Sequence, residues 1–305
     1  MWIVPASHDM THRRLGREPV TARTRTVRAL RLRDGRTVHY PAVMGILNVT
    51  PDSFSDGGRY LDPSEARDHA MQMEAEGAAI IDVGGESTRP GAQEVPIAEE
   101  IQRVVPVIEL LASRLRVPIS IDTRKAEVAR AALQAGAMIV NDVSGLAHDP
   151  EMLPLIARTR AALVIMHSRA ASDIANRDGR YRDVLSAVIT FLRRQTALAV
   201  RNGVARSRII VDPGLGFAKA ARHNLQILVG LKRLVALGYP VLIGASRKRF
   251  VRQIAGGSDE DVRFGDAAVD AFALAAGASI VRVHEVAPAV AVARMVAAIA
   301  ACGRA

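Results

Sequence analysis

The hydrophobic pattern from Val43 onward alternates between two kinds of segment. Short, mostly apolar runs rich in β-branched residues are each followed by a longer stretch with helical spacing, and glycine stands at many junctions. Apolar runs of this length are typical of strands buried on both faces of a parallel sheet. Eight such strands are predicted: Val43–Val49, Ala79–Gly84, Pro118–Asp122, Met138–Asp142, Ala162–Met166, Ile209–Asp212, Val241–Gly244 and Ile280–Val283.

The segments between the strands carry helix signals. One helix is marked by apolar residues on a single face: Ile97, Ile101, Val104, Ile108 and Leu111. A second is predicted over residues 125–134, before Gly136, and a leucine stripe over residues 225–234 predicts one helix that ends at Gly238. Strand–helix alternation repeated eight times predicts an α/β fold, a (β/α)8 TIM barrel, with an open doubly wound sheet as the alternative.

Length and charge divide the chain near residue 40. The 305 residues are 49% hydrophobic, which suits one barrel domain over residues 41–305. Residues 1–40 hold nine arginines against three acidic residues, a net +6 of the +10 on the whole chain. We expect a basic N-terminal extension, partly disordered, and favour this over nucleic-acid binding because no aromatic residues are interleaved for base stacking. Alternation around Asp34-Gly35 predicts a β-hairpin that would close the bottom of the barrel.

Two absences narrow the class of protein. The single cysteine, Cys302, allows no disulfide within one chain, so a reducing compartment is expected. No run of about 18 uncharged apolar residues occurs in the sequence. We therefore expect a cytoplasmic protein without a membrane span.

Each predicted strand ends in polar or charged residues. In a TIM barrel these ends open on a single rim, where active sites are built. The fold itself requires only apolar strand interiors, so eight polar ends at one rim indicate a functional site. These ends carry Asn48, Asp82 with Glu86, Asp122, Asn141 with Asp142, His167, Asp212, Ser246 with Arg247 and Lys248, and Arg282 with His284.

The rim residues fall into two chemical groups. Carboxylates and an amide suit a flat heterocycle with several N–H donors, such as an aminopyrimidinone: Asp122, Asn141 and Asp212. The second group suits an anion, because arginine offers a forked phosphate contact and lysine a point charge: Asn48, Arg247, Lys248, Arg282 and His284. The Asn48 carbonyl can help hold Mg²⁺ that bridges substrate phosphates. Zinc has little support because no HxH or HExxH spacing occurs.

Seven ordered segments make the chain similar to the dihydropteroate synthases from Met44 to about Met295. They are MGILNVTPDSFSDGG (44–58), DVGGESTRPGA (82–92), IDTRKAEVA (121–129), NDVSG (141–145), DPGLGFAK (212–219), SRKRF (246–250) and RVHEV (282–286). The resemblance implies a transferase of folate biosynthesis that condenses 6-hydroxymethyl-7,8-dihydropterin pyrophosphate with p-aminobenzoate, giving 7,8-dihydropteroate and pyrophosphate. It also implies Mg²⁺ as cofactor, these two small molecules as substrates and a homodimer.

The resemblance further implies three groups of binding residues. Pterin-binding positions are Asp122, Asn141, Val143, Met166, Asp212 and Lys248, with catalytic roles expected for Asp122, Asp212 and Lys248. Pyrophosphate-binding positions are Asn48, Arg247, Arg282 and His284, with Asn48 as the metal ligand. The p-aminobenzoate pocket, which sulfonamides also occupy in the family, would use Phe54, Thr88, Arg89, Pro90, Phe217 and Ser246.

The sequence departs from the family pattern in places, and two other functions stay open. Glu285 follows His284 where aspartate is usual, and Ser168-Arg169 stands where a glycine-containing turn is common. A pterin-binding methyltransferase would share the carboxylate and amide group but would not need the anion group. A catalytically silent paralogue would keep the fold without turnover, although the anion-site and loop residues are all present here.

Overall fold

The computed structural model describes residues 29–49, 63–87, 93–168 and 181–303, which fold around a barrel of eight parallel strands. The strands are β3 (Ala42–Asn48), β4 (Ile80–Gly84), β5 (Ile119–Asp122), β6 (Ile139–Asp142), β7 (Ala162–Met166), β8 (Ile209–Asp212), β9 (Leu242–Ile243) and β10 (Ile280–Val283). Their order is β8-β7-β6-β5-β4-β3-β10-β9, and a parallel bridge between Val211 and Val241 joins the two outer strands. The predicted TIM barrel is confirmed, and the open-sheet alternative is wrong.

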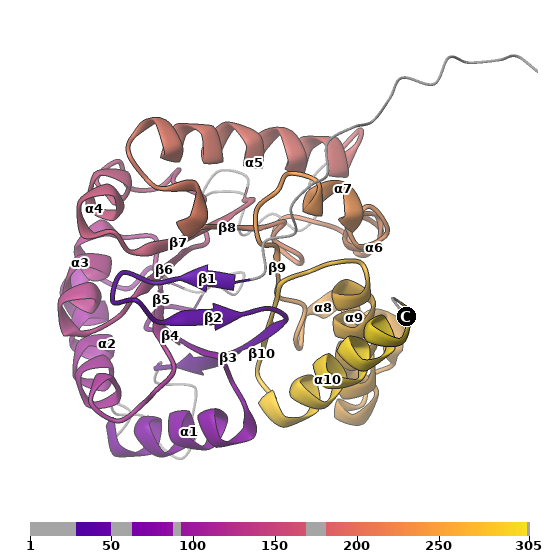
Figure 1. The fold of residues 1–305 in the computed structure, drawn as a ribbon, viewed down its shortest axis with the longest axis horizontal. Helices are drawn as coiled ribbons and strands as arrows, with labels where there is room; N and C mark the ends of the chain where they lie inside the picture. Colours follow the sequence, from indigo (N-terminus) through magenta and orange to yellow (C-terminus); the bar gives the residue numbers. More distant parts are fainter. Residues whose placement is uncertain (1–28, 50–62, 88–92, 169–180, 304–305) are drawn as a thin grey trace, which may run out of the picture.

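Ten helices surround the barrel within the described residues (Figure 1). They are α1 (Pro63–Glu76), α2 (Ile97–Ala112), α3 (Ala126–Ala135), α4 (Met152–Thr159), α5 (Val184–Arg201), α6 (Ala221–Val229), α7 (Leu231–Val235), α8 (Arg249–Ala255), α9 (Asp259–Ala275) and α10 (Val286–Cys302), with a 3₁₀ turn at Arg206–Arg208. None of these helices is long and apolar enough to cross a membrane. The helices predicted around residues 97–111 and 125–134 are confirmed as α2 and α3.

The single helix predicted from the leucine stripe at residues 225–234 is wrong, because it is broken at Gly230. Helix α6 ends at Val229 and α7 begins at Leu231. A Cβ added to Gly230 would lie 2.1 Å from Cδ2 of Leu185 on α5. The glycine therefore allows α5 to pack directly against the backbone at the break.

Apolar side chains pack on both faces of the barrel sheet. One cluster lies between strands and helices and includes Val43, Ile81, Val104, Ile108 and Leu111. The other fills the barrel interior and contains Leu30, Leu32, Val38, Ala42, Met44, Ile80, Ile139, Ala162, Val164, Ile210, Leu242 and Ile280. Burial on both faces explains why the strands read as nearly continuous apolar runs instead of alternating ones.

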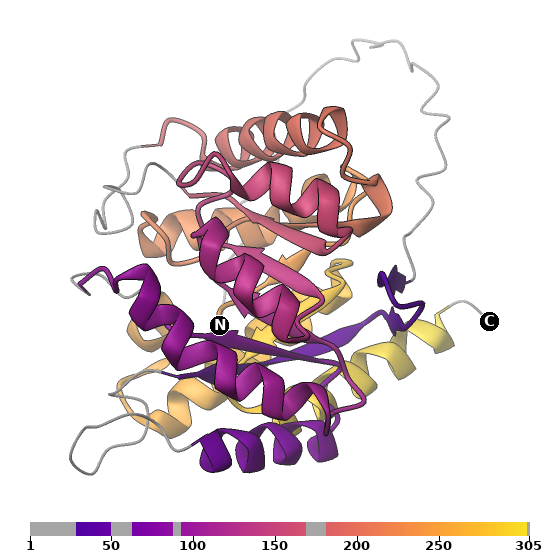
Figure 2. The ribbon, with the colours of Figure 1, turned by 90° about the vertical axis from the view of Figure 1, so that its left-hand side faces the viewer.

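The predicted hairpin closes one end of the barrel (Figures 1 and 2). Strands β1 (Ala29–Arg31) and β2 (Thr37–His39) pair antiparallel around a turn that contains Gly35 at φ +89°. The interior cluster joins hairpin residues to the first residues of the barrel strands. In addition, Arg33 Nη2 donates to the carbonyls of Leu133 and Ala137, at 2.9 Å each. The opposite rim, formed by the carboxyl ends of the strands, is left for the site.

Candidate active site

Six of the predicted site residues are the last or the next-to-last residue of a strand: Asn48 (β3), Asp122 (β5), Asn141 (β6), Met166 (β7), Asp212 (β8) and Arg282 (β10). Strand register places Asp122 beside Asn141, and Met166 beside Asp212. Because all eight barrel strands are parallel, these residues share the rim opposite the hairpin.

Arg282 is the centre of a charged network at this rim. Its Nε donates to Asp82 Oδ2 at 2.6 Å, and its Nη2 donates to Asp122 Oδ2 at 2.7 Å. Asn141 Nδ2 donates to the same Asp82 oxygen at 2.9 Å. The network joins Arg282 of the predicted anion group to the predicted pterin residues. Fully buried Asp82 is one of the polar residues predicted at the rim but is assigned to neither chemical group, although a charge inside an apolar strand is a signal for a role.

Burial and charge both act on the Asp122 carboxyl. Burial raises its pKa to about 7, and the positive charge of Arg282 opposes this rise. Three neighbouring carboxyl groups add to it: Asp82, Glu100 and Asp142. Asp122 is therefore only partly ionised near neutrality, and a positive charge placed beside it would favour its carboxylate form.

Asp212, which is buried, and Lys248, which is half-buried, are opposite charges that act on each other at the rim. Burial raises the pKa of Asp212, although Lys248 and a 2.6 Å hydrogen bond from Gly214 N oppose the rise. Burial lowers the pKa of Lys248 to about 8, against the charge of Asp212. Lys248 Nζ donates to the carbonyl of Leu215 and lies 4.4 Å from the centroid of the Phe217 ring. The cation therefore stands between the predicted pterin and p-aminobenzoate residues.

Val143 and Met166, predicted to line the pterin pocket, are both buried at this end of the barrel. Asp142 fixes the turn after β6, because its carboxylate accepts hydrogen bonds from Ser144 N and Leu146 N, each at 2.8 Å. That turn begins with Val143. Asp142 thus supports the rim through the backbone.

Ser246 connects the strand β9 side of the rim to His284. Ser246 Oγ lies 3.1 Å from His284 Nδ1 and donates to Asp266 Oδ2 at 3.2 Å. The same Asp266 oxygen accepts from Arg247 N at 2.9 Å, where Arg247 has a φ of +57°. Asp266 on α9, which the sequence does not single out, therefore orients three predicted residues. One of several aspartates in a helical pattern, Asp266 gave no signal for that role.

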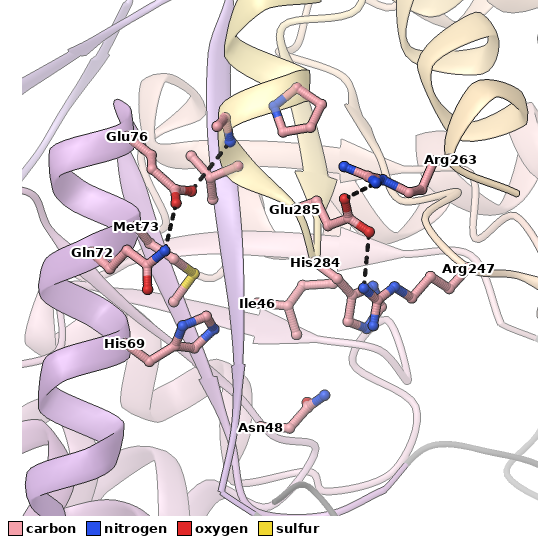
Figure 3. A pocket seen from close by; sticks show the side chains of 13 residues that line it. Ile46, Asn48, His69, Gln72, Met73, Glu76, Arg247, Arg263, His284 and Glu285 are labelled. Carbon is pink, nitrogen blue, oxygen red and sulfur yellow. Dashed lines mark hydrogen bonds and ion pairs between the residues drawn. The ribbon is translucent and has the colours of Figure 1, made fainter. Parts of the chain in front are cut away.

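A pocket of about 470 Å³ opens beside these residues (Figure 3). Three residues of the predicted pyrophosphate group line it: Asn48, Arg247 and His284. The facing wall comes from α1 and contains His69, Gln72, Met73 and Glu76. Figure 3 shows the His69 ring directed from α1 toward the interior of the pocket. Nothing in the local sequence marks His69, which reads as an ordinary helix residue.

Four predicted p-aminobenzoate residues lie outside the described residues: Phe54, Thr88, Arg89 and Pro90. The other two, Phe217 and Ser246, are at the rim beside Lys248 and His284 respectively. In the described part of the chain, no group of three or more His, Cys, Asp or Glu side chains is arranged to hold a metal ion.

Comparison with known proteins shows which of the pterin-binding families compatible with this rim the chain belongs to. The model of the pterin binding enzymes matches residues 44–284. The dihydropteroate synthase of Mycobacterium leprae is 51% identical over 251 residues, covering 80% of this chain and 88% of that protein. The chain belongs to the dihydropteroate synthase family.

Solved structures of dihydropteroate synthases agree with this assignment. The Xanthomonas albilineans enzyme with 4-aminobenzoic acid superposes with a TM-score of 0.84 at 42% identity, over 90% of this chain and 98% of that one. The Yersinia pestis enzyme in a sulfonamide drug complex gives 0.84 at 39% identity, over 90% and 99%. The predicted resemblance is confirmed, and the chain is a transferase of folate biosynthesis with small-molecule substrates.

Glu285 stands where aspartate is usual in dihydropteroate synthases, and its contacts are visible in the structure. Its Oε1 accepts from Arg247 Nη2 at 3.0 Å, and its Oε2 pairs with Arg263 Nε at 2.8 Å. The glutamate thus holds two guanidinium groups at the edge of the pocket (Figure 3). Arg263, on α9, is a further lining residue that the sequence does not mark.

Proposed function

We propose that this chain joins 6-hydroxymethyl-7,8-dihydropterin pyrophosphate to p-aminobenzoate, forming 7,8-dihydropteroate and releasing pyrophosphate. The observation that carries the proposal is a single rim with two adjoining parts. One part has two carboxylates and an amide, Asp122, Asp212 and Asn141, which suit a flat pterin. The other is the pocket, where arginine, histidine and amide side chains stand together with Glu76 and Glu285, and its cationic and amide groups suit pyrophosphate. The Xanthomonas relative bound to 4-aminobenzoic acid supports the second substrate.

The reaction exchanges one bond at the exocyclic methylene of the pterin. The C–O bond to pyrophosphate breaks and its electron pair leaves with pyrophosphate. The lone pair of the arylamine nitrogen forms the new C–N bond, and that nitrogen then loses a proton. Because the electron-rich dihydropterin can carry positive charge as the C–O bond lengthens, we favour a dissociative path.

The buried carboxylates would stabilise that positive charge. Asp212 is buried and the Asp122 side chain is 12% exposed, so both would contribute negative charge where water is largely excluded and electrostatic stabilisation is large. Asn141 and Lys248 would orient the ring through hydrogen bonds. The remaining contacts proposed for the pterin are apolar: Val143 and Met166.

The pyrophosphate end would be bound by Asn48, Arg247, Arg282 and His284. Asn48 fits Mg²⁺ because its amide oxygen is a hard ligand and its side chain lines the pocket. Among the described residues, no cluster of three or more acidic, histidine or cysteine side chains surrounds the ion site. This suits an ion that keeps several of its own waters. When bound, Mg²⁺ would neutralise negative charge that develops on the leaving pyrophosphate. Arg282 and His284 would add hydrogen bonds to the same group.

The p-aminobenzoate would approach the methylene beside Phe217 and Ser246. Four further contacts are proposed from the resemblance: Phe54, Thr88, Arg89 and Pro90. An arylamine is a free nucleophile at neutral pH, so its attack requires no strong general base. Sulfonamides would compete for this pocket, in keeping with the Yersinia relative in complex with a sulfonamide drug.

We also propose that the chain forms a homodimer through α9 and α10, which pack against each other. Four large apolar side chains on these helices are mostly exposed: Phe264 (69%), Phe272 (51%), Met295 (63%) and Ile299 (65%). Apolar surface of this kind commonly marks a protein interface. The cytoplasm is the proposed compartment and suits the exposed, unpaired Cys302.

Pyrophosphate release by the purified protein tests the proposed reaction. The assay supplies dihydropterin pyrophosphate and Mg²⁺, with or without p-aminobenzoate. We expect release that depends on p-aminobenzoate and is lost when Mg²⁺ is chelated. A folded protein that binds the pterin but releases no pyrophosphate would instead favour the silent paralogue or the methyltransferase.

A further inference from the structure

Lys219 is a buried cation at the rim that belongs to none of the predicted groups of site residues. It lies in the connection between β8 and α6, two residues after Phe217, and is 5% exposed. Its ammonium donates to the carbonyl oxygens of Gly214 at 2.8 Å and Phe217 at 3.0 Å, and lies 3.5 Å from that of His167. These contacts fold the connection back on itself and join it to the segment that follows β7.

The backbone of this connection adopts an uncommon conformation. Ala218 has a φ of +48°, in the left-handed region that residues other than glycine rarely adopt. The chain reverses there, and the next side chain, Lys219, bonds to carbonyls that precede it. Fully buried Asn224 on α6 accepts a hydrogen bond from Gly216 N at 2.9 Å. Such a conformation persists only where surrounding contacts determine it, and here Lys219 and Asn224 supply them.

The folded connection packs along the side chain of Lys248, which stands at the start of α8. Lys248 Nζ donates to the Leu215 carbonyl and lies 4.4 Å from the centroid of the Phe217 ring. A Cβ added to Gly216 would lie 2.6 Å from Lys248 Cδ, so the aliphatic part of the lysine passes directly over the glycine. Three consecutive residues of the connection therefore fix both the stem and the ammonium of Lys248.

Lys219 also acts on the charge that faces Lys248. Burial raises the pKa of Asp212, and the positive charges of Lys248 and Lys219 oppose this rise, together with the hydrogen bond from Gly214 N. Ionised Asp212 in turn favours the protonated form of Lys248, whose pKa burial lowers to about 8. The charged groups that face Lys248 from the barrel strands are Asp212 on β8, Arg282 on β10 and Asp122 on β5.

We propose that Lys219 is a positioning residue for Lys248, acting through the connection between β8 and α6. The inference rests on the proposed function, in which Lys248 orients the pterin ring. Without the Lys219 ammonium, the connection loses the contacts that hold the Leu215 carbonyl and the Phe217 ring beside Lys248. Lys248 then has no fixed position, and its protonated form is less stable.

Steady-state kinetics of Lys219→Gln test this role. The amide keeps two N–H donors for the carbonyls of the connection but has no charge and a shorter reach. We expect kcat/KM for dihydropterin pyrophosphate to fall about 10- to 100-fold, because small displacements of a positioned group have effects of this size. The alkaline limb of its pH profile, which reports the protonated form of Lys248, should move to lower pH.

The same change in a Lys248→Met background separates positioning from general damage. If Lys219 acts through Lys248, Lys219→Gln should lower kcat/KM there less than about threefold, because the group that it positions is already absent. Lys219→Arg keeps the charge but replaces the diverging donors by a planar fork, so its kcat/KM should lie between those of the wild type and Lys219→Gln. It remains informative if Lys219→Gln does not fold.

Arg33→Gln is the matched control, because Arg33 is also a cation that holds backbone carbonyls. Its Nη2 donates to the carbonyls of Leu133 and Ala137 at 2.9 Å each, at the hairpin end of the barrel. The change should lower the midpoint of urea unfolding. The alkaline limb and the KM values for both substrates, dihydropterin pyrophosphate and p-aminobenzoate, should stay unchanged.

The possible outcomes separate the inference from the proposed function. A loss of kcat/KM with a shifted alkaline limb, and no such loss in the Lys248→Met background, supports positioning by Lys219. An alkaline limb that does not move, or an equal loss with and without Lys248, overturns it in a protein whose wild type is active. Absence of p-aminobenzoate-dependent pyrophosphate release in the wild type defeats the proposed function itself.

Discussion

At the scale of single residues, the rim holds its charges in opposed pairs before any substrate is present. Arg282 bridges Asp82 and Asp122, and Lys248 lies in the field of Asp212. Charges fixed in this way need little reorganisation when positive charge develops on the pterin, and this is how preorganised sites lower a barrier. The free-energy cost of bringing several carboxylates together at the rim is therefore met when the chain folds, not during each turnover.

Asp122→Asn tests whether this charge acts on the transition state. The change keeps the size of the side chain but removes its negative charge. We expect kcat to fall about 100-fold, while the Kd for dihydropterin pyrophosphate changes less than about threefold. Kinetics and calorimetric titration measure the two quantities. Equal losses in both would assign Asp122 to binding of the ground state.

Asp122 and Lys248 together predict how activity depends on pH. Asp122 must be ionised to favour a cation, and its pKa of about 7 makes kcat/KM for the pterin substrate rise with pH through that value. Lys248 must be protonated, and its pKa of about 8 makes the same quantity fall above that value. A profile measured with saturating p-aminobenzoate should therefore peak between the two, and Asp122→Asn should lose the acid limb. An acid limb that persists in this variant would have another origin.

The positions of these residues could be predicted from sequence, but their partners could not. Parallel strands bring polar strand ends to one rim, so Asp122 and Asn141 were identifiable from pattern alone. The contact of Arg282 with Asp82 spans 200 residues and depends on closure of the barrel. His69 likewise could not be predicted from sequence, because it lines the pocket only once α1 packs beside β3.

At the scale of secondary structure, the strands were predictable because burial on both faces leaves unbroken apolar runs. The predicted strand Val43–Val49, for example, corresponds to β3 at Ala42–Asn48. The leucine stripe at residues 225–234 misled because its period continues across Gly230, where the helix stops. The deciding contact there is the approach of Leu185 from α5, which no local pattern contains.

The hairpin is an element whose contribution can be measured separately from catalysis. Fully buried Leu30 lies in the interior cluster at the end of the barrel opposite the site. We expect Leu30→Ala to lower the free energy of unfolding by about 3 kcal/mol, because it leaves a cavity in a packed core. Urea denaturation measures this loss, and both KM values should stay unchanged. A large change in either KM would mean that the hairpin end is coupled to the rim.

At the scale of the whole molecule, the barrel separates stability from chemistry. The hairpin and the first residues of the strands form an apolar plug, whereas the strand ends at the other rim hold buried carboxylates and cations. The rim groups are costly to bury and gain their stabilisation from each other, as the opposed effects on the pKa values of Asp212 and Lys248 indicate. The apolar plug stabilises the fold at one end and so offsets the cost of burying charged groups at the other.

The remaining large feature is the exposed apolar surface on α9 and α10, which predicts self-association. Phe264 is 69% exposed on α9, and Ile299 is 65% exposed on α10. If a second copy covers this surface, Phe264→Glu places an unpaired charge in the interface and should weaken the dimer about 30-fold or more, as loss of an aromatic anchor does. Analytical ultracentrifugation over a range of concentrations measures the equilibrium.

Val200→Glu is the matched control for the dimer prediction. Val200 is 41% exposed on α5, which Figure 1 places on a different side of the barrel from α9 and α10. The same charge introduced there should leave the equilibrium unchanged, because α5 is not part of the proposed interface. A monomeric wild type, or equal weakening by both substitutions, would show that the apolar surface on α9 and α10 does not join two copies of the chain. If Phe264→Glu leaves the dimer intact, the interface must lie on other helices.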